Sequence, residues 1–272
     1  MMLLFLAALL PALSTSDADR SGAVTLAVPR VEYRMNEAAA TRSPWIDANG
    51  WRILRHPEAR YYYDAPSTAA GLAAAEAFAY GANARIHTDA AGAGEFSQML
   101  EFLRRIPERA LPPQANIGVI DDGSDETGEL MNLLSRRNLL YVIVRAPAPK
   151  LDVNVRIGSK EYPKEDAANP AALAQKIRAR IGDEKRLLRI YGSEVVIARL
   201  LGDRANARVH LLNYSNRKVL GLRVRVLGEY RSQKLFASGD PRAAVADAVV
   251  KGGATEFTIP EMGTYAVIDL SQ

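Results

Sequence analysis

Residues 115–144 read ANIGVIDDGSDETGELMNLLSRRNLLYVIV, and this stretch decides the fold class. The apolar run of residues 115–120 predicts a buried strand, and the polar turn 121–125 leads from it into a helix over residues 126–137. A second apolar run, residues 139–144, follows at once. Because a strand, a helix and another continuously apolar strand in this order are typical of a right-handed crossover, the stretch predicts a parallel sheet.

The same alternation extends toward the N-terminus. Ser67 or Thr68 can cap a helix that runs to Tyr80 and is closed by Gly81. A short strand is expected over residues 84–88, and an amphipathic helix over residues 95–106. We therefore predict an α/β domain over residues 67–165 with a sheet of roughly three to five strands. Residues 19–66 are expected to form an irregular segment that packs on it, with short strands at 51–54 and 60–63.

The C-terminal part, residues 166–272, changes to a period of two after one leading helix. Asn169 and Pro170 are suited to the start of that helix, as cap and first residue. A hairpin is predicted from residues 195–201 and 207–214, and residues 220–227 alternate most cleanly. About seven short strands spaced by 8–12 residues indicate a β-sandwich. The predicted fold class is α/β plus all-β.

Composition excludes several kinds of chemistry. The 272 residues contain no cysteine, which excludes disulfides, thiolate metal sites, cysteine nucleophiles and a lipidated cysteine. The three histidines are far apart, so no histidine metal site is expected, and no cofactor motif is present. With 35 Lys and Arg against 31 Asp and Glu, the net charge is only +4.

The first 18 residues are predicted to be a signal peptide. Their apolar run of about ten residues is too short to span a membrane, which takes about 20. No Lys or Arg precedes that run, so an uncleaved tether is the alternative. An exported chain without cysteine fits the bacterial periplasm or the outside of the cell. No other segment is apolar enough to be transmembrane.

Strings in the C-terminal part carry a resemblance to a known group of enzymes. They are VHLLNY (209–214), LRVRV (222–226), FTIP (257–260) and YAVIDL (265–270). They are similar to the small β-sandwich that closes many bacterial glycoside hydrolases of the β-galactosidase type. Residues 67–165 resemble the flavodoxin-like middle domain of the same enzymes. The catalytic barrel of those enzymes needs about 250 residues, and only about 50 precede the α/β region here. The resemblance therefore implies accessory parts of a glycosidase without its catalytic barrel.

The first candidate site is the turn that holds Asp121, Asp122 and Asp125. Ligands of open parallel sheets bind beyond the carboxyl ends of the strands, where this turn is expected. Its carboxylates could bind a hard cation or accept bonds from sugar hydroxyls. Alternatively, Ser124 or Asp122 caps the following helix and the other acids favour its dipole. The turn lacks the glycines of a phosphate loop.

The second candidate site contains Trp45, Asp47, Asn49 and Trp51. Aromatic faces with nearby amide and carboxylate groups suit sugar binding. Alternatively, the tryptophans are buried between the N-terminal segment and the α/β domain.

Residues 176–234 hold 15 Lys and Arg against 5 Asp and Glu. Such a surface could bind an acidic polysaccharide or another anionic partner, although a solvated strand face is the simpler interpretation. Nucleic acid is disfavoured because no reader motif is present.

The spacing of the acidic residues in the sequence does not identify a catalytic pair. Glu76, Glu95, Glu129 and Glu194 could each contribute to a glycosidase pair, but no two are singled out. His210 alternates within a strand and is interpreted as a satisfied strand residue. The leading hypothesis is an exported, non-catalytic carbohydrate-associated module that binds glycans or docks on a partner enzyme. A hydrolase that uses carboxylates at the strand ends and a structural envelope protein are the alternatives.

Overall fold

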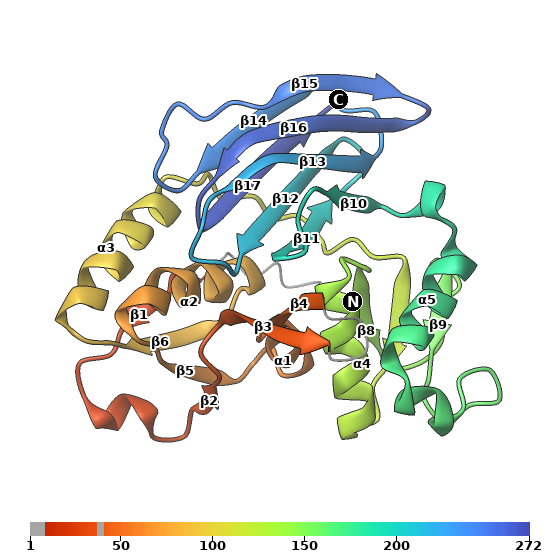
Figure 1. Ribbon diagram of the computed structural model, residues 1–272, viewed down its shortest axis with the longest axis horizontal. Helices are drawn as coiled ribbons and strands as arrows, with labels where there is room; N and C mark the ends of the chain where they lie inside the picture. Colours follow the sequence, from red (N-terminus) through yellow and green to blue (C-terminus); the bar gives the residue numbers. More distant parts are fainter. Residues whose placement is uncertain (1–8, 37–40) are drawn as a thin grey trace.

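The computed structural model describes residues 9–36 and 41–272. An α/β layer made by the first two thirds of the chain lies beneath a β-sandwich made by the last third (Figure 1). The α/β layer itself has two parts, each built on its own small parallel sheet. The predicted combination of an α/β region with an all-β region is therefore confirmed.

The first part of the α/β layer contains a parallel sheet in the order β1-β6-β5-β2. Two long helices follow its strands, and Figure 1 shows α2 between this sheet and the sandwich. The elements are β1 (Ala12–Leu13), β2 (Val24–Leu26), β5 (Arg60–Asp64), α2 (Ser67–Tyr80), β6 (Asn83–His87) and α3 (Ala90–Arg104).

The second part contains the stretch that predicted the parallel sheet. Strand β7 lies between β8 and β9, and both pairings are parallel. The elements are β7 (Ile117–Ile120), α4 (Asp125–Arg136), β8 (Tyr141–Val144), β9 (Val153–Val155), η2 (Lys164–Ala168), α5 (Pro170–Ile181) and η3 (Asp183–Lys185). As predicted, Asn169 caps α5, its Oδ1 accepting from the Ala172 amide at 3.1 Å.

The parallel strands do not form the one continuous sheet expected of a flavodoxin-like domain. Between α3 and β7 the chain leaves the α/β layer and runs beside the sandwich. There the Gln114 amide donates to Leu200 at 2.9 Å, and the Gly202 amide donates to Pro112 at 2.8 Å. Because Pro112 and Pro113 have no amide hydrogen, this segment forms only an isolated bridge with β11, at Pro113 and Leu201. Strand β7, which follows it, belongs to the separate sheet β8-β7-β9.

The sandwich consists of two four-stranded antiparallel sheets, in the orders β10-β13-β16-β15 and β11-β12-β17-β14. A core of aliphatic residues and Phe257 fills the space between them. Its strands are β10 (Leu188–Tyr191), β11 (Val196–Gly202), β12 (Asn206–Asn213), β13 (Val219–Leu227), β14 (Ser232–Ala237), β15 (Ala246–Lys251), β16 (Ala254–Met262) and β17 (Tyr265–Ser271).

The sheet β11-β12-β17-β14 is covered on both faces. Its outer face packs on α2 and α3, and residues such as Ile197, Leu212 and Val267 join the core of the first α/β part. Helix α2 is rich in alanine and buried nearly all round, since sheets flank it on two sides. A helix that is apolar all round needs such an enclosed position.

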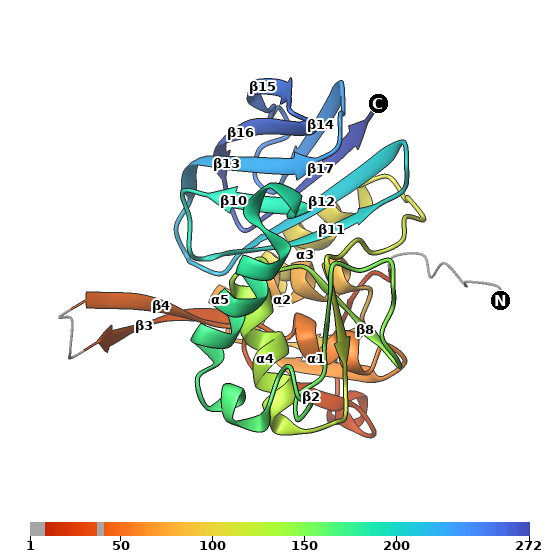
Figure 2. The same ribbon diagram turned by 90° about the vertical axis from the view of Figure 1, so that its right-hand side faces the viewer.

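The segment 19–66 is more regular than the sequence suggests. It contains β2, the hairpin of β3 (Arg30–Asn36) and β4 (Thr41–Asp47), α1 (Gly50–Arg55) and β5, besides the short η1 (Asp17–Arg20). Figure 2 shows the hairpin extending away from the rest of the molecule. The strand expected over residues 51–54 is helix α1 instead. Within the described residues, no helix is long and apolar enough to cross a membrane.

Candidate functional site

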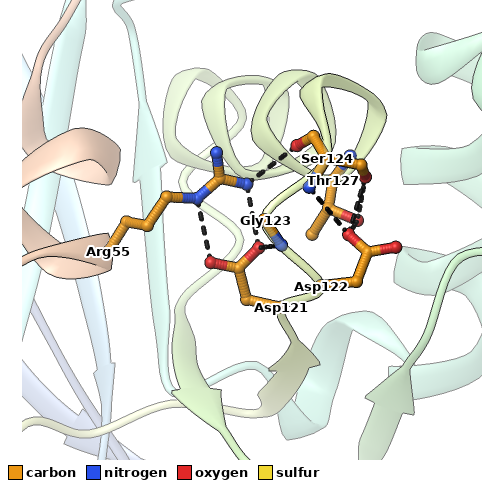
Figure 3. Close-up of polar contacts among 6 residues, drawn as sticks. All are labelled: Arg55, Asp121, Asp122, Gly123, Ser124 and Thr127. Carbon is orange, nitrogen blue, oxygen red and sulfur yellow. Dashed lines mark hydrogen bonds and ion pairs between the residues drawn. The ribbon is translucent and has the colours of Figure 1, made fainter.

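The turn after β7 is held by an arginine from α1 (Figure 3). Arg55 donates from Nε and Nη2 to the two carboxylate oxygens of Asp121, both at 2.9 Å, and from Nη2 to the Ser124 carbonyl at 3.0 Å. The Arg55 and Asp121 side chains are only 11% and 12% exposed. Because both oxygens of Asp121 accept from Arg55, this carboxylate has little capacity left for a ligand.

The carboxylate of Asp122 accepts hydrogen bonds from residues at the start of α4. Its Oδ1 accepts from the Ser124 amide at 3.0 Å, the Ser124 hydroxyl at 2.6 Å and the Thr127 hydroxyl at 2.9 Å. These bonds, above all that from the Ser124 hydroxyl, lower the pKa of Asp122 to about 2. Asp125 is exposed in the first turn of α4. The contacts of the turn are those of the helix-capping alternative.

The tryptophan candidates do not share one surface. Trp51 is 8% exposed and packs on α4 at Gly128, where a Cβ would come within 3.0 Å of the indole. Asn49 is fully buried. Trp45 and Asp47 lie on β4, where the indole Nε1 donates to Asp47 at 3.1 Å and the Arg136 guanidinium stacks 3.8 Å from the ring centre. Trp51 and Asn49 thus have structural roles, and Trp45 is the one indole near the surface.

A buried carboxylate that the sequence did not single out joins three parts of the chain. Glu76 on α2 is fully buried. Its Oε1 accepts from the Asn49 amide at 2.8 Å and from the Tyr214 hydroxyl at 2.6 Å. Its Oε2 accepts from Asn49 Nδ2 at 2.9 Å and from the Tyr63 hydroxyl at 3.0 Å. Burial raises the pKa of Glu76 above its ordinary value, while these four bonds act in the opposite direction.

The Glu76 cluster is a junction rather than a reaction site. Asn49 precedes α1, Tyr63 lies on β5, and Tyr214 follows β12 of the sandwich. The carboxylate has four donors, which is its full acceptor capacity, and it has no contact with solvent. The one sequence signal for it is a glutamate within the alanine-rich run of α2.

Two arginines of the basic stretch face inward instead of toward solvent. Arg208 on β12 is 3% exposed and makes a two-bond pair with Asp269 on β17, at 2.6 and 2.9 Å. Arg199 on β11 donates to the carbonyl of Ala79 at the end of α2 and stacks on Tyr80, 5.3 Å from the ring centre. Desolvation lowers the pKa of Arg199. Arg186 and Arg225 are also buried, at 7% and 5% exposed, so the interpretation of this stretch as a solvated strand face does not hold at these four positions.

A cavity of about 470 Å³ lies at the boundary between the α/β layer and the sandwich. Its polar wall comes from β11 and β12, with Arg199, Arg208 and His210. Its apolar wall includes Phe78 on α2 and Leu103 at the end of α3. Within the described residues, no group of three or more His, Asp or Glu side chains is arranged to hold a metal ion.

Comparison with known proteins shows similarity at the level of the fold. No protein family matches this sequence, and no curated protein matches it. Among solved structures, α-L-fucosidase isoenzyme 2 from Paenibacillus thiaminolyticus is similar with a TM-score of 0.57 and 9% identity, over 81% of this chain and 62% of that chain. This chain therefore spans less than two thirds of the length of that enzyme.

Two further glycoside hydrolases are more distant. A β-galactosidase from Bacillus circulans sp. alkalophilus has a TM-score of 0.44 and 10% identity, over 75% of this chain and 52% of that chain. A GH30 endoxylanase from Clostridium papyrosolvens has a TM-score of 0.29 and 9% identity, over 78% and 42%. The mixed α/β and β-sandwich fold of this chain partly resembles that of the fucosidase, and at 9% identity the likeness concerns the fold alone.

Proposed function

We propose that this chain is an exported, non-catalytic, carbohydrate-associated accessory protein, which binds a glycan or docks on a partner enzyme. The proposal rests on the turn after β7, whose leading carboxylates are already bound by other groups of the protein. This turn lies at the carboxyl end of a parallel strand, where ligands of open α/β folds usually bind. Its two leading carboxylates are bound to Arg55 and to the N-terminus of α4.

A glycosidase needs a pair of carboxyl groups on either side of the scissile bond, one of them free to give up a proton. Asp121 and Asp122 are both held by protein donors, and Glu76 is enclosed on all sides. This favours binding over hydrolysis. The fold likeness to a fucosidase supports the carbohydrate association, because related scaffolds are used by enzymes that act on sugars.

The proposal is tested by affinity electrophoresis of the purified protein through gels that contain neutral or acidic polysaccharides. Retention by at least one polysaccharide, without any release of reducing ends from it over a day, is the expected result. Release of reducing ends that is lost in Asp121→Asn would favour the hydrolase alternative. Migration unaffected by every polysaccharide would remove the glycan-binding form of the proposal.

A further inference from the structure

The polar wall of the cavity is built by one face of the sheet β11-β12-β17-β14. Arg199 on β11 is paired directly with His210 on β12, and Arg208 precedes His210 by two residues. Directly opposite residues of antiparallel strands, and residues two apart along a strand, point to the same face. The register therefore brings these three side chains together, and all three line the cavity.

His210 presents an unused donor there. The side chain is 3% exposed, and its Nδ1 lies 2.5 Å from the hydroxyl of Tyr265. Burial raises the pKa of Tyr265, so its phenol keeps its proton, and Nδ1 is its one acceptor among the described residues. The proton of the neutral ring is thereby placed on Nε2. Nε2 is buried and has no partner in the described part of the chain, a state that buried polar atoms rarely adopt.

Arg199 has spare donors and no counter-ion. One of its nitrogens donates to the Ala79 carbonyl, and its guanidinium stacks on Tyr80. Among the described residues it takes part in no ion pair within 4.0 Å. A guanidinium has five N–H donors in a planar fork that matches a carboxylate, so most of its capacity is free.

The charge around the cavity is also unbalanced. Arg208 is paired with Asp269, and Arg109 shares the same carboxylate at 3.3 Å. Arg109 is itself exposed, so the inner wall holds two arginines, Arg199 and Arg208, against the one aspartate. Glu58, Glu108 and Arg104 lie at the exposed rim, where solvent screens them. An anion inside the cavity would balance the inner excess.

We propose that this cavity binds a small organic carboxylate, whose oxygens accept hydrogen bonds from Arg199 and from Nε2–H of His210. The body of the ligand packs against Phe78 and Leu103 on the opposite wall. The volume is within the range of small-molecule sites, about 300–1,000 Å³. A uronic acid is the form of this ligand that rests on the proposed carbohydrate function, and a non-sugar carboxylate is the other source.

The first test is isothermal titration of the full chain with D-glucuronate, benzoate, D-glucose and inorganic phosphate. We expect saturable binding of a carboxylate and none of glucose. Arg199→Gln and His210→Gln are each expected to weaken that binding about 10- to 100-fold, as for lost hydrogen bonds to a charged group. Arg204→Gln, the same substitution in the exposed turn between β11 and β12, is the matched control and is expected to change nothing.

The second test works on the unmodified protein, so it does not depend on the variants folding. The chain has three histidines, and His56 and His87 are exposed and are not among the residues that line the cavity. In NMR spectra with labelled histidine, a bound carboxylate is expected to shift the His210 signal and leave the other two in place.

The outcomes separate the two proposals. Benzoate that binds through Arg199 while glucuronate does not would support the carboxylate site and count against the carbohydrate function. Glucuronate that binds equally to wild type and Arg199→Gln would overturn the site and leave the carbohydrate function standing. A His210 signal that no carboxylate moves, or phosphate that binds as well as any carboxylate, would also overturn it.

Discussion

The hydroxyl of Tyr214 donates a 2.6 Å hydrogen bond to Oε1 of Glu76, and this bond connects the β-sandwich to the α/β layer. The two residues are 138 positions apart in the sequence. The same carboxylate accepts two bonds from Asn49 and one from Tyr63, so the segment before α1, strand β5 and helix α2 meet at one buried group. Together with the apolar core between α2 and the sheet β11-β12-β17-β14, this junction holds the sandwich over α2, beside the cavity.

Replacing Glu76 with Gln is expected to destabilise the protein by about 1–3 kcal/mol. The new amide nitrogen must face donors, either the Asn49 amide and Tyr214 or Asn49 Nδ2 and Tyr63, and at least one buried donor loses its acceptor. Chemical unfolding measures the change. Glu101→Gln, at an exposed position on α3, is the control and is expected to leave the unfolding free energy within about 0.5 kcal/mol.

The same residue gives the stability a pH dependence. Burial raises the folded pKa of Glu76 above its ordinary value of 4.5, so the folded state binds this proton more tightly than the unfolded state. Its contribution is fully present below pH 4.5 and is lost as the pH rises through the folded pKa. Unfolding free energies measured from pH 4 to 8 should therefore show a smaller decline in Glu76→Gln than in wild type. Parallel curves would contradict the raised pKa.

Asp121 is expected to matter for stability rather than for ligand binding. Asp121→Asn leaves Arg55 without its two-bond partner in a site that is nine-tenths buried, which costs about 1–3 kcal/mol. Thermal unfolding followed by circular dichroism measures the loss. Polysaccharide retention by the folded variant should equal that of wild type. A selective loss of retention at unchanged stability would indicate instead that Asp121 takes part in polysaccharide binding.

The two tryptophans are expected to report different environments. In Trp45→Phe the remaining tryptophan is Trp51, which lies on α1 and is buried against α4. Its fluorescence should therefore be shifted to the blue and insensitive to added polysaccharide. In Trp51→Phe the partly exposed Trp45 should emit further to the red. Quenching by acrylamide should be stronger for the second variant, and the reverse order would contradict the burial described here.

We expect the chain without residues 1–18 to keep its fold. Strand β1 is a two-residue edge strand that pairs with β6 through Ala12 and Leu13, and the Ser14 amide adds one bond to Ile86 at 2.8 Å. Leu9 and Leu10, which line the cavity, are 39% and 43% exposed. Removal of Leu9 and Leu10 widens the cavity mouth, and the buried apolar surface lost comes mainly from Pro11 and Leu13 at the sheet edge. A thermal unfolding curve of the truncated chain checks this; a truncated chain that fails to unfold cooperatively would be the contrary result.

Most of the secondary structure could be predicted from local sequence patterns. The apolar strands β7 and β8, the capped start of α5 and the alternating β13 all follow from propensity and period, which act within a few residues. Helix α1 was missed because its residues 51–54 are as apolar as a strand, and its start at Asn49 is fixed by distant Glu76. Between the two parallel sheets the chain contacts β11 through Pro112 and Gln114, and such long-range contacts are encoded by no local pattern.

The candidate sites were harder to predict for the same reason. Aspartates after a strand predict a ligand site and a helix cap equally well, and only the position of Arg55, 66 residues away, distinguishes the two. Arg199 and His210 belong to strands whose faces are both covered, so their alternation gave no sign of which face meets solvent. Their meeting depends on strand register and on the docking of α2.

The most direct test of the account is saturation-transfer NMR of the full chain in an equimolar mixture of D-glucuronate and D-glucose oligosaccharides. We expect transfer to the acidic sugar alone, with both oligosaccharides intact at the end of the experiment. Transfer to neither sugar would contradict the glycan-binding role, and a steady loss of either oligosaccharide would contradict the non-catalytic one.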